Sequence, residues 1–296
     1  MPCASACRNC RALASMGEAR DAGADLVVFP ELALDRFFPQ YQVCGWADSV
    51  AEPIPGPTTD RIAARARELS LVTVFNLYER DGQGRKFDSS PVFEADGSLL
   101  GVTRMVHITE YACFHEQGYY APGDRGLPVY DTAVGRVGVA ICYDRHYPEV
   151  MRALAVAGAQ LVVVPQAGAV GEWPDGLYEA ELRVAAFQNG YFTALCNRVG
   201  REPVLDFAGE SFVCAPSGEV LAREAEAHER RLGLVRLRVG AVAESDEHLV
   251  EDRRPLERQV LVEVADPIAL GRRDRPAVGR LLTQQDPEQG RLVVPV

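Results

Sequence analysis

An internal repeat constrains the fold of this chain more than any other feature of its sequence. Residues 8–21 and 148–157 have the apolar spacing of amphipathic helices, and the segments GADLVVFPE and GAQLVVVPQ follow them at residues 23–31 and 158–166. In both copies the helix ends at Gly-Ala, a continuous apolar strand follows, and proline with a polar residue closes it. Two similarly built halves predict an α/β fold in which helices lie outside layered sheets.

Shorter patterns predict the remaining elements. Strands are predicted at 71–77, 91–95, 99–105, 191–196, 210–215 and 233–238, and helices at 57–69 and 177–189. Asp-Gly at 96–97 and Ser-Gly at 217–218 predict hairpin turns. Because no linker or low-complexity block interrupts the chain, we expect a single domain over residues 1–296, with a polar, Arg-rich C-terminal extension at 246–296.

The composition argues against several classes of protein. The 296 residues are 47% hydrophobic and carry a formal net charge of −11, whereas nucleic-acid binding needs clustered Lys and Arg for phosphate contacts. No apolar run approaches the roughly 20 residues of a membrane span, and no signal peptide is recognisable. We therefore expect a cytoplasmic protein without membrane or nucleic-acid partners, whose eight cysteines are thiols.

The amino terminus contains three closely spaced cysteines. The spacing of Cys3, Cys7 and Cys10 resembles that of the iron–sulfur ligands in radical enzymes that use S-adenosylmethionine. No strand or glycine motif follows them, and chain ends are usually poorly ordered, so we do not predict a cluster. The five histidines form no ligand-spaced group with the cysteines. We therefore predict neither a metal nor any other cofactor.

Cys142 stands where an apolar strand stops. In GRVGVAICYDRHYPEV, residues 135–150, the strand ends at this cysteine, polar residues follow, and Pro148 begins a helix. A thiol at a strand end beside a helix start is well placed to be a nucleophile if a base and a positive environment are near. The alternative is a buried structural cysteine that behaves as a small apolar side chain.

Glu31 stands at the end of the first repeat strand. Ligands and chemistry in α/β sheets gather at the carboxyl ends of strands, so Glu31 and Cys142 are candidates for one site. Glu31 would then be a general base. The alternative is an ordinary helix-capping or solvated glutamate.

Six segments resemble the successive signature blocks of the nitrilase superfamily of carbon–nitrogen hydrolases. They are GADLVVFPEL, DGSLLGVTRMVHI, EQGYYAPGD, GRVGVAICYDRHYPE, NRVGRE and FAGESFVCAPSGEVLA, in the order of the family and over about residues 18 to 255. The resemblance implies a four-layer α-β-β-α sandwich with internal pseudo-symmetry. It also implies a small-molecule amide or carbamoyl substrate and assembly as a homodimer or higher homo-oligomer.

The resemblance assigns roles to individual residues. The family glutamate falls on Glu31 and the nucleophilic cysteine on Cys142, which would form a thioester with the substrate. The backbone N–H of Tyr143 would hold the tetrahedral oxyanion. A second acidic residue of the family matches Glu116, which would orient the substrate or its neighbours.

The third catalytic residue of the family, a lysine, is missing here. Its block reads RMVH, with Met105 at the lysine position, and Met105 offers neither charge nor a hydrogen-bond donor. Lys86, the only lysine of the chain, does not align with this position. Strand alternation places His107 on the same face as Met105 and Arg104 on the other, so His107 is the better substitute. Alternatively, His107 is a core histidine satisfied by its neighbours.

The residues after the nucleophile suggest a substrate class. CYDRHYPE is similar to the arrangement in N-carbamoyl amino acid and β-ureidopropionate hydrolases, in which an arginine at the position of Arg145 binds a substrate carboxylate. Alternatively, Arg145 pairs with Asp144 or caps the next helix. Asn197, together with Glu172 and Trp173 in the GEWP loop, is expected to line the pocket mouth.

Two hypotheses about function follow. The first is a thiol amidohydrolase that acts through Cys142 and Glu31. The second is a catalytically impaired homologue that retains the fold as a binding or interaction protein, and Met105 favours it. Residues 1–17 lack the strand with which the family begins, so the start is atypical or truncated, or a central strand is absent and an edge is exposed.

Overall fold

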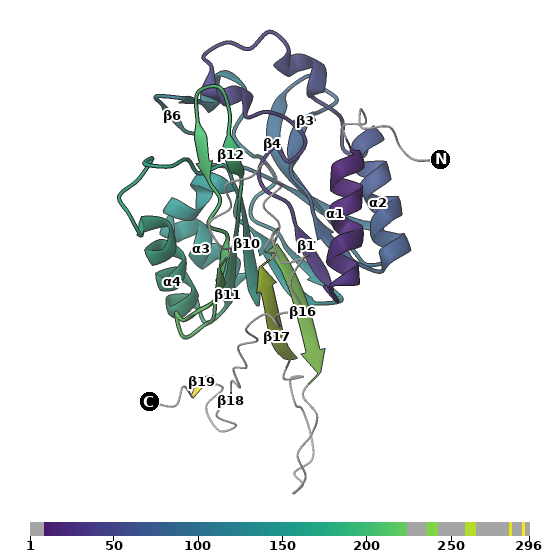
Figure 1. Cartoon of the computed structure of the whole chain (residues 1–296), viewed down its shortest axis with the longest axis vertical. Coiled ribbons are helices and arrows are strands. Elements are labelled where there is room, and N and C mark those ends of the chain that lie inside the picture. The colour runs from purple at the N-terminus through teal and green to yellow at the C-terminus, as the bar shows by residue number, and fades with distance from the viewer. Residues whose placement is uncertain (1–8, 224–234, 242–257, 265–283, 286–291, 294–296) are drawn as a thin grey trace, which may run out of the picture.

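The computed structural model describes residues 9–223, 235–241, 258–264, 284–285 and 292–293. Two β-sheets pack face to face, and each has two helices on its outer face (Figure 1). The expected four-layer α-β-β-α sandwich is therefore confirmed. Cys3, Cys7 and most of the 246–296 extension lie outside the described residues.

The first sheet contains seven strands. They are β1 (Leu26–Val28), β2 (Val72–Val74), β3 (Leu77–Arg80), β4 (Lys86–Phe93), β5 (Leu99–Arg104), β16 (Val235–Ala241) and β17 (Arg258–Val264). The order is β17-β16-β1-β2-β4-β3, and β5 also pairs with β4. β1 is parallel to β2 and antiparallel to β16, so the first repeat strand lies inside the sheet.

The second sheet contains six strands in the order β15-β14-β11-β10-β9-β8. They are β8 (Val129–Thr132), β9 (Gly135–Val139), β10 (Leu161–Gln166), β11 (Phe192–Asn197), β14 (Phe212–Cys214) and β15 (Val220–Arg223). β9, β10 and β11 run parallel, so their carboxyl ends lie at one edge of the sheet. The residues that follow these strands, Cys142 among them, therefore meet at that edge.

Four α-helices form the outer layers. They are α1 (Cys10–Asp21) and α2 (Pro57–Leu69) over the first sheet, and α3 (Pro148–Val156) and α4 (Leu177–Asn189) over the second. The predicted helices are confirmed, and α2 and α4 have the expected bounds. Pro57 begins α2 at a position where a missing N–H costs nothing, and Ser70 ends it in the left-handed conformation.

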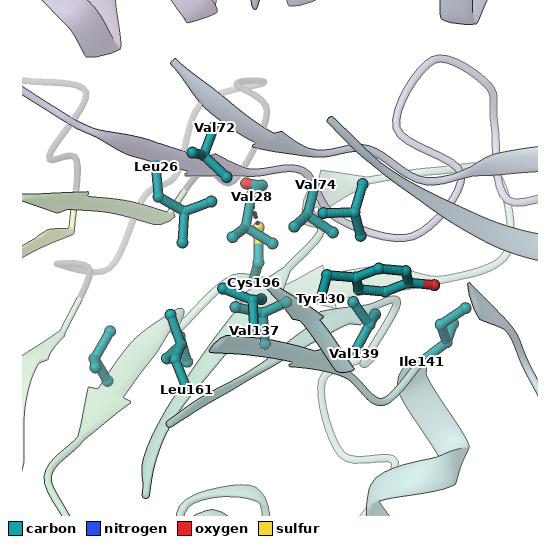
Figure 2. Close-up of a cluster of buried hydrophobic side chains, with 14 of the residues drawn as sticks. Leu26, Val28, Val72, Val74, Tyr130, Val137, Val139, Ile141, Leu161 and Cys196 are labelled. Atoms are coloured by element: carbon teal, nitrogen blue, oxygen red, sulfur yellow. Dashed lines mark hydrogen bonds between the residues drawn. The ribbon is translucent and has the colours of Figure 1, made fainter. Parts of the chain in front are cut away.

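The two repeat strands are apolar throughout because both of their faces are covered. In β1, Leu26 and Val28 face the other sheet, while Val27 faces α1 and α2. In β10, Val163 faces the other sheet and Val162 faces α3 and α4. Figure 2 shows the core between the sheets, where the thiol of Cys196 also donates to the carbonyl of Val28 at 3.1 Å. This alternation explains the continuous apolar runs of the repeat.

Some predictions about strands were wrong. The predicted strand 71–77 is divided into β2 and β3, because the side chain and backbone of Asn76 bind the segment that follows β1. β8, β15 and β17 were not predicted, whereas both hairpin turns are confirmed, with Gly97 and Gly218 at φ 81° and 80°.

The short elements are β6 (Glu110–Tyr111), β7 (Phe114–His115), β12 (Val199–Arg201), β13 (Asp206–Ala208), β18 (Gln284–Gln285), β19 (Leu292–Val293), η1 (Phe38–Gln40), η2 (Ala47–Val50), η3 (Glu116–Gly118) and η4 (Cys142–His146).

The cysteines differ in one respect from expectation. Cys10 is disulfide-bonded, so the prediction that all eight are thiols is wrong there. The described free cysteines are Cys44, Cys113, Cys142, Cys196 and Cys214. Within the described ranges, no helix has the length and apolar character needed to cross a membrane.

Candidate active site

Cys142 occupies a sharp turn between β9 and α3. Its φ of 44° lies in the left-handed region that non-glycine residues rarely adopt, and such strain concentrates at functional sites. The N–H of Asp144 donates to the carbonyl of Ile141 at 2.9 Å, and Nη1 of Arg145 donates to the carbonyl of Cys142 at 2.8 Å. These two bonds hold the turn that presents the thiol.

The Cys142 thiol is 7% exposed and lies among acids. Burial raises the pKa of the thiol well above its ordinary value, and the nearby Glu31 and Glu116 raise it further, while Arg145 acts in the opposite direction. The thiol is therefore protonated at rest. A nucleophile in this state needs a base to take its proton as it attacks.

Glu31 supplies a carboxyl group beside that thiol. It is 0% exposed, and neither carboxyl oxygen has a hydrogen bond of standard geometry. Burial, followed by the charge of Glu116, raises the pKa of Glu31 to about 8, although Asp88, Cys142 and Arg198 act to lower it. A pKa of about 8 lies close to the value at which a general base works best near neutral pH.

The backbone around Glu31 is fixed from two sides. Nη1 of Arg198 donates to the carbonyls of Glu31 and Leu32 at 2.9 and 2.8 Å. The N–H of Leu32, a residue with φ 45°, donates to Oδ1 of Asn76 at 2.6 Å. These bonds hold the chain where β1 ends, so the Glu31 side chain points from a rigid support.

Glu116 begins η3 and is the second buried glutamate of the site. Its Oε2 accepts from the N–H of Thr109 at 3.4 Å, and its Oε1 has no partner. Burial and the neighbouring Asp88 raise the pKa of Glu116 well above its ordinary value. The structure thus brings Glu31, Glu116 and Cys142 together, and their catalytic roles stay predictions.

Met105 occupies the lysine position as a fully buried apolar residue. Its side chain belongs to the core between the sheets, and its N–H donates to the carbonyl of Asp88 at 3.0 Å. The two cations nearest in sequence are engaged elsewhere: Lys86 pairs with Asp48, and Arg104 binds Glu79 on the opposite face of β5. Neither one takes the place of the missing ammonium group.

His107 has partners other than the thiol. β5 ends at Arg104, so the strand alternation that was expected to place His107 beside Met105 does not extend that far. Nδ1 of His107 lies 2.9 Å from Oδ1 of Asp144, and its ring stacks on Tyr147 with centroids 3.5 Å apart. These contacts fit the alternative of a satisfied histidine, and a catalytic role for His107 stays a prediction.

Arg145 and Asn197 are both buried and both hydrogen-bonded. Arg145 does not pair with Asp144; it contacts the carbonyl of Cys142, and its Nε lies 3.4 Å from Oε2 of Glu181. Asn197 accepts from the N–H of Gly168 at 2.7 Å and donates to its carbonyl at 3.1 Å. Asn197 therefore holds the loop that follows β10.

Four half-buried rings form a closed circuit next to the nucleophile turn, which we call the aromatic ring cluster: Tyr111, Tyr143, His146 and Trp173. Centroid distances around the circuit are 6.3 Å (111–143), 4.9 Å (143–146), 5.0 Å (146–173) and 5.9 Å (173–111). Trp173 was expected at the pocket mouth; Tyr111 and His146 were not singled out in the sequence.

The carboxylate of Glu172 is tied to this cluster. It accepts hydrogen bonds from the hydroxyls of Tyr111 and Tyr178, the latter at 2.6 Å, and from the N–H of Ala169 at 2.8 Å. Glu172 also raises the pKa of Cys142, which places its charge near the thiol. The site therefore joins aromatic faces to a fixed negative charge.

Asp88 and Arg198 are site residues that the sequence reasoning missed. Asp88 lies in a polar Asp-Ser-Ser run inside β4, and all three residues are buried. Polar residues buried within a strand are a signal of a site, but burial was not visible before the strand was placed. Arg198 directly follows Asn197, and nothing in its type or spacing indicated a role.

The site shows no donor set for a metal. Among the residues that the structure describes, no group of three or more His, Cys, Asp and Glu side chains is arranged to hold a metal ion.

The combination of strand-end glutamate, turn cysteine and four-layer sandwich agrees with a match over most of the sequence. Residues 10–244 match the model of the family described as Carbon-nitrogen hydrolase. The chain belongs to this family. It is a carbon–nitrogen hydrolase of the nitrilase superfamily, as the signature blocks predicted.

Individual relatives agree with this assignment. The chain is 32% identical over 227 residues to an N-carbamoylputrescine amidase of Solanum lycopersicum, which covers 71% of this chain and 74% of that protein. It is 36% identical over 154 residues to a beta-ureidopropionase of Arabidopsis thaliana, covering 51% of this chain and 38% of that protein.

A solved structure is similar in fold. A mutant of the amidase from Nesterenkonia sp. AN1 superposes with a TM-score of 0.65 and 27% identity, covering 75% of this chain and 83% of that chain. That structure shows the result of Michael addition of acrylamide at the active-site cysteine. The carbon–nitrogen hydrolase described here thus resembles amidases in both sequence and fold.

Proposed function

We propose that this carbon–nitrogen hydrolase cleaves N-carbamoyl or carboxamide compounds through a thioester on Cys142, with Glu31 as general base. The observation that carries the proposal is the buried Glu31 carboxyl, which has two unpartnered oxygens beside a strained, protonated thiol. A structural cysteine in the core needs no such base. The arrangement matches the geometry of an activated nucleophile.

In the first half of the reaction, the sulfur of Cys142 attacks the carbonyl carbon as Glu31 takes the thiol proton. The C–N bond then breaks, Glu31 passes this proton to the leaving nitrogen, and ammonia or an amine departs from the thioester. In the second half, Glu31 takes a proton from water, the hydroxide attacks the thioester, and the C–S bond breaks. The sulfur recovers a proton, which restores the resting site.

The oxyanion of each tetrahedral intermediate needs hydrogen-bond donors. We assign one to the backbone N–H of Tyr143, at the turn that follows the nucleophile, since preorganised donors of this kind stabilise developing charge. Arg145 fixes the orientation of this turn through its bond to the Cys142 carbonyl. We assign Glu116, which lies near the thiol, to orienting the substrate or Glu31.

The charge of the pocket favours a substrate with a cationic tail. The aromatic ring cluster offers ring faces, and Glu172 offers a carboxylate held by two tyrosine hydroxyls. Aromatic faces and a carboxylate together attract an ammonium group. The name of the Solanum relative, an N-carbamoylputrescine amidase, agrees with such a substrate.

The Arg145 prediction points in the opposite direction, toward a substrate carboxylate. Because Arg145 already contacts Glu181 and the Cys142 carbonyl, we expect it to support the turn rather than the substrate. Comparing kcat/KM for N-carbamoylputrescine and N-carbamoyl-β-alanine separates the two ideas. A preference for the carbamoyl acid that is lost in Arg145→Ala would restore the carboxylate role.

Ammonia release from carbamoyl amines, carbamoyl acids, carboxamides and nitriles tests the proposed reaction. We expect Cys142→Ala and Glu31→Gln each to lower turnover by about four orders of magnitude or more, as for residues that act as one catalytic unit. Circular dichroism verifies that both variants fold. Turnover that persists in Cys142→Ala would rule out the thioester.

Met105 supports a second candidate function. A site that lacks the lysine of its family fits a catalytically impaired homologue that binds the same compounds without cleaving them. Calorimetric binding of N-carbamoylputrescine with no ammonia release in the native protein would favour this candidate. Binding together with release would exclude it.

Homo-oligomeric assembly and a cytoplasmic location stay predictions. Val184 and Phe187 on α4 are 51% and 66% exposed, and Val156 on α3 is 81% exposed, so this outer layer carries uncovered apolar side chains. We propose that a second copy of the chain covers them. Light scattering coupled to size-exclusion chromatography gives the mass of the particle and so tests whether two or more chains assemble. Cell fractionation tests the cytoplasmic location.

A further inference from the structure

Asp88, on β4, is a buried acid to which the reaction above gives no task. Its side chain is 0% exposed, Oδ1 accepts a hydrogen bond from Nδ2 of Asn76 at 2.6 Å, and Oδ2 has no partner. A buried carboxylate oxygen without a donor is costly, whereas a protonated oxygen in that place is itself a donor. A protonated Oδ2 would therefore need a hydrogen-bond acceptor beside it.

Two contacts place Asp88 between the missing lysine and Glu31. Its carbonyl accepts from the N–H of Met105 at 3.0 Å, so it lies directly against the lysine position. The Asn76 side chain that binds Asp88 also accepts from the N–H of Leu32, the residue after Glu31. Both oxygens of Glu31 lack partners and are shielded from solvent, and the Glu31 side chain contacts that of Asp88, so Glu31 offers an acceptor to Oδ2.

The groups that face this carboxyl pair come from several elements. Glu116 from η3, Cys142 and Asp144 from η4, and the buried Tyr120 hydroxyl all act on Asp88, on Glu31 or on both. The guanidinium of Arg198 acts on Glu31 and is also paired with Glu202.

Burial and the adjacent Glu31 raise the pKa of Asp88 well above its ordinary value. Asn76 opposes this shift, and Asp144 adds to it. Two buried carboxyls side by side cannot both be charged at low cost, so one proton is shared between them.

We propose that Asp88 is a positioning residue that holds a proton on Oδ2 and donates it in a hydrogen bond to the Glu31 carboxylate. This stabilises the basic form of Glu31, a task that a nearby cation would otherwise perform. The inference rests on the proposed role of Glu31 as base. During turnover Glu31 gains and loses the proton of the thiol or of water, while Asp88 keeps its own.

Alkylation of Cys142 by iodoacetamide tests the inference without requiring turnover. The sulfur forms a bond to the methylene carbon, the C–I bond breaks, iodide leaves, and the thiol proton passes to Glu31. The rate, followed by mass spectrometry of the Cys142 peptide in the full-length protein, rises with pH as Glu31 becomes a carboxylate. The midpoint of this rise in native protein, in Asp88→Asn and in Asp88→Leu is the measured quantity.

We expect Asp88→Asn to keep the midpoint within about half a pH unit of the native value, because the amide N–H replaces the carboxyl proton as donor. We expect Asp88→Leu, which offers no donor, to raise the midpoint by about one pH unit or more. Ser89→Ala is the matched control, since Ser89 is the next residue of β4 and binds Glu79 on the opposite face. It leaves the midpoint unchanged.

A fall of the midpoint by about one pH unit in Asp88→Asn would overturn the inference, because it would mean that native Asp88 is an anion that raises the pKa of Glu31. This result decides the question even if Asp88→Leu does not fold. A native midpoint in Asp88→Leu would also overturn it. Glu31→Gln removes the pH-dependent rise if the base is Glu31; a rise that persists would overturn the inference at its premise. If the midpoints are as expected but no ammonia is released, the positioning role of Asp88 is supported and the hydrolytic function is rejected.

Discussion

Two buried acids, Glu79 and Asp88, lie on opposite faces of the β4–β5 hairpin. They differ in whether a cation pairs with them among the described residues. On one face, Glu79 accepts from Nε of Arg104 at 2.8 Å and from the hydroxyl of Ser89 at 2.6 Å. On the other face lies Asp88 of β4, whose carbonyl accepts from the N–H of Met105, the residue that directly follows β5. Side chains alternate along a strand, so neighbouring residues contribute to two different environments.

The comparison shows what a cation does to a buried carboxyl. Glu79 is held by a guanidinium in a charge-assisted geometry, and Arg104 has its pKa raised by this partner, so the pair is structural. Glu31 and Asp88 have no such ion pair, and burial raises the pKa of both. Glu31, whose pKa is raised to about 8, can exchange a proton near neutral pH, which is what a general base must do.

Removal of the Arg104 guanidinium gives the largest expected effect on stability. In Arg104→Met, buried Glu79 loses its closest cation and keeps only the half-exposed Arg125 at 3.7 Å, and breaking a buried ion pair in this way costs about 3 to 5 kcal/mol. Urea unfolding followed by fluorescence measures the loss. If the free energy of unfolding falls by less than about 1 kcal/mol, Glu79 needs a cation no more than Asp88 and Glu31 do.

Addition of a cation on the site face is the complementary change. We expect Met105→Lys to raise ammonia release about 100- to 1000-fold, since one preorganised donor to an oxyanion is worth about 2.7 to 4 kcal/mol. The same lysine lowers the pKa of Glu31, so the pH at which the rate rises moves down. Met105→Leu keeps the size without the charge and shows neither change. An unaltered rate in Met105→Lys would mean that the site already has an equivalent donor.

The pH dependence of stability distinguishes the two faces further. The pKa of Glu31 rises from 4.5 to about 8 on folding, so the folded chain holds a proton that the unfolded chain has released. This contribution lowers stability as pH rises from about 4.5 to about 8. Glu31→Gln removes this pH-dependent contribution. At pH 8 we expect the free energy of unfolding of the variant to be about 2 kcal/mol higher than that of the native protein, after allowing for the cost of the buried amide. The difference shrinks toward pH 5, and its absence at pH 8 would contradict the raised pKa.

An exposed pair near the hairpin gives the smallest effect. Arg85 is 45% exposed and pairs with Asp81 and Asp124 at 2.8 and 2.9 Å. Because water screens such pairs, we expect Arg85→Ala to leave the midpoint of urea unfolding nearly unchanged. A cost as large as that of Arg104→Met would show that burial is not the cause of the difference.

Much of the fold was predictable because the pattern of each element is local. The two repeat strands and the four helices follow from periodicity, since both faces of β1 and β10 are covered and one face of each helix is buried. β8 and β15 were missed because edge strands with mixed burial carry a weak pattern. The division between β2 and β3 was missed because it depends on the contact of Asn76 with Leu32, 44 residues away in sequence.

The sequence by itself determined the nature of the candidate catalytic groups: a cysteine and a glutamate that follow strands, a second glutamate, and an apolar residue where the family has lysine. Only the tertiary structure decided their surroundings. It turned His107 toward Asp144 and Arg145 toward Glu181, and it placed Asp88 beside Glu31. The physical reason is that residue identity fixes which groups can titrate or donate, whereas burial and neighbours from distant segments fix their pKa values and partners.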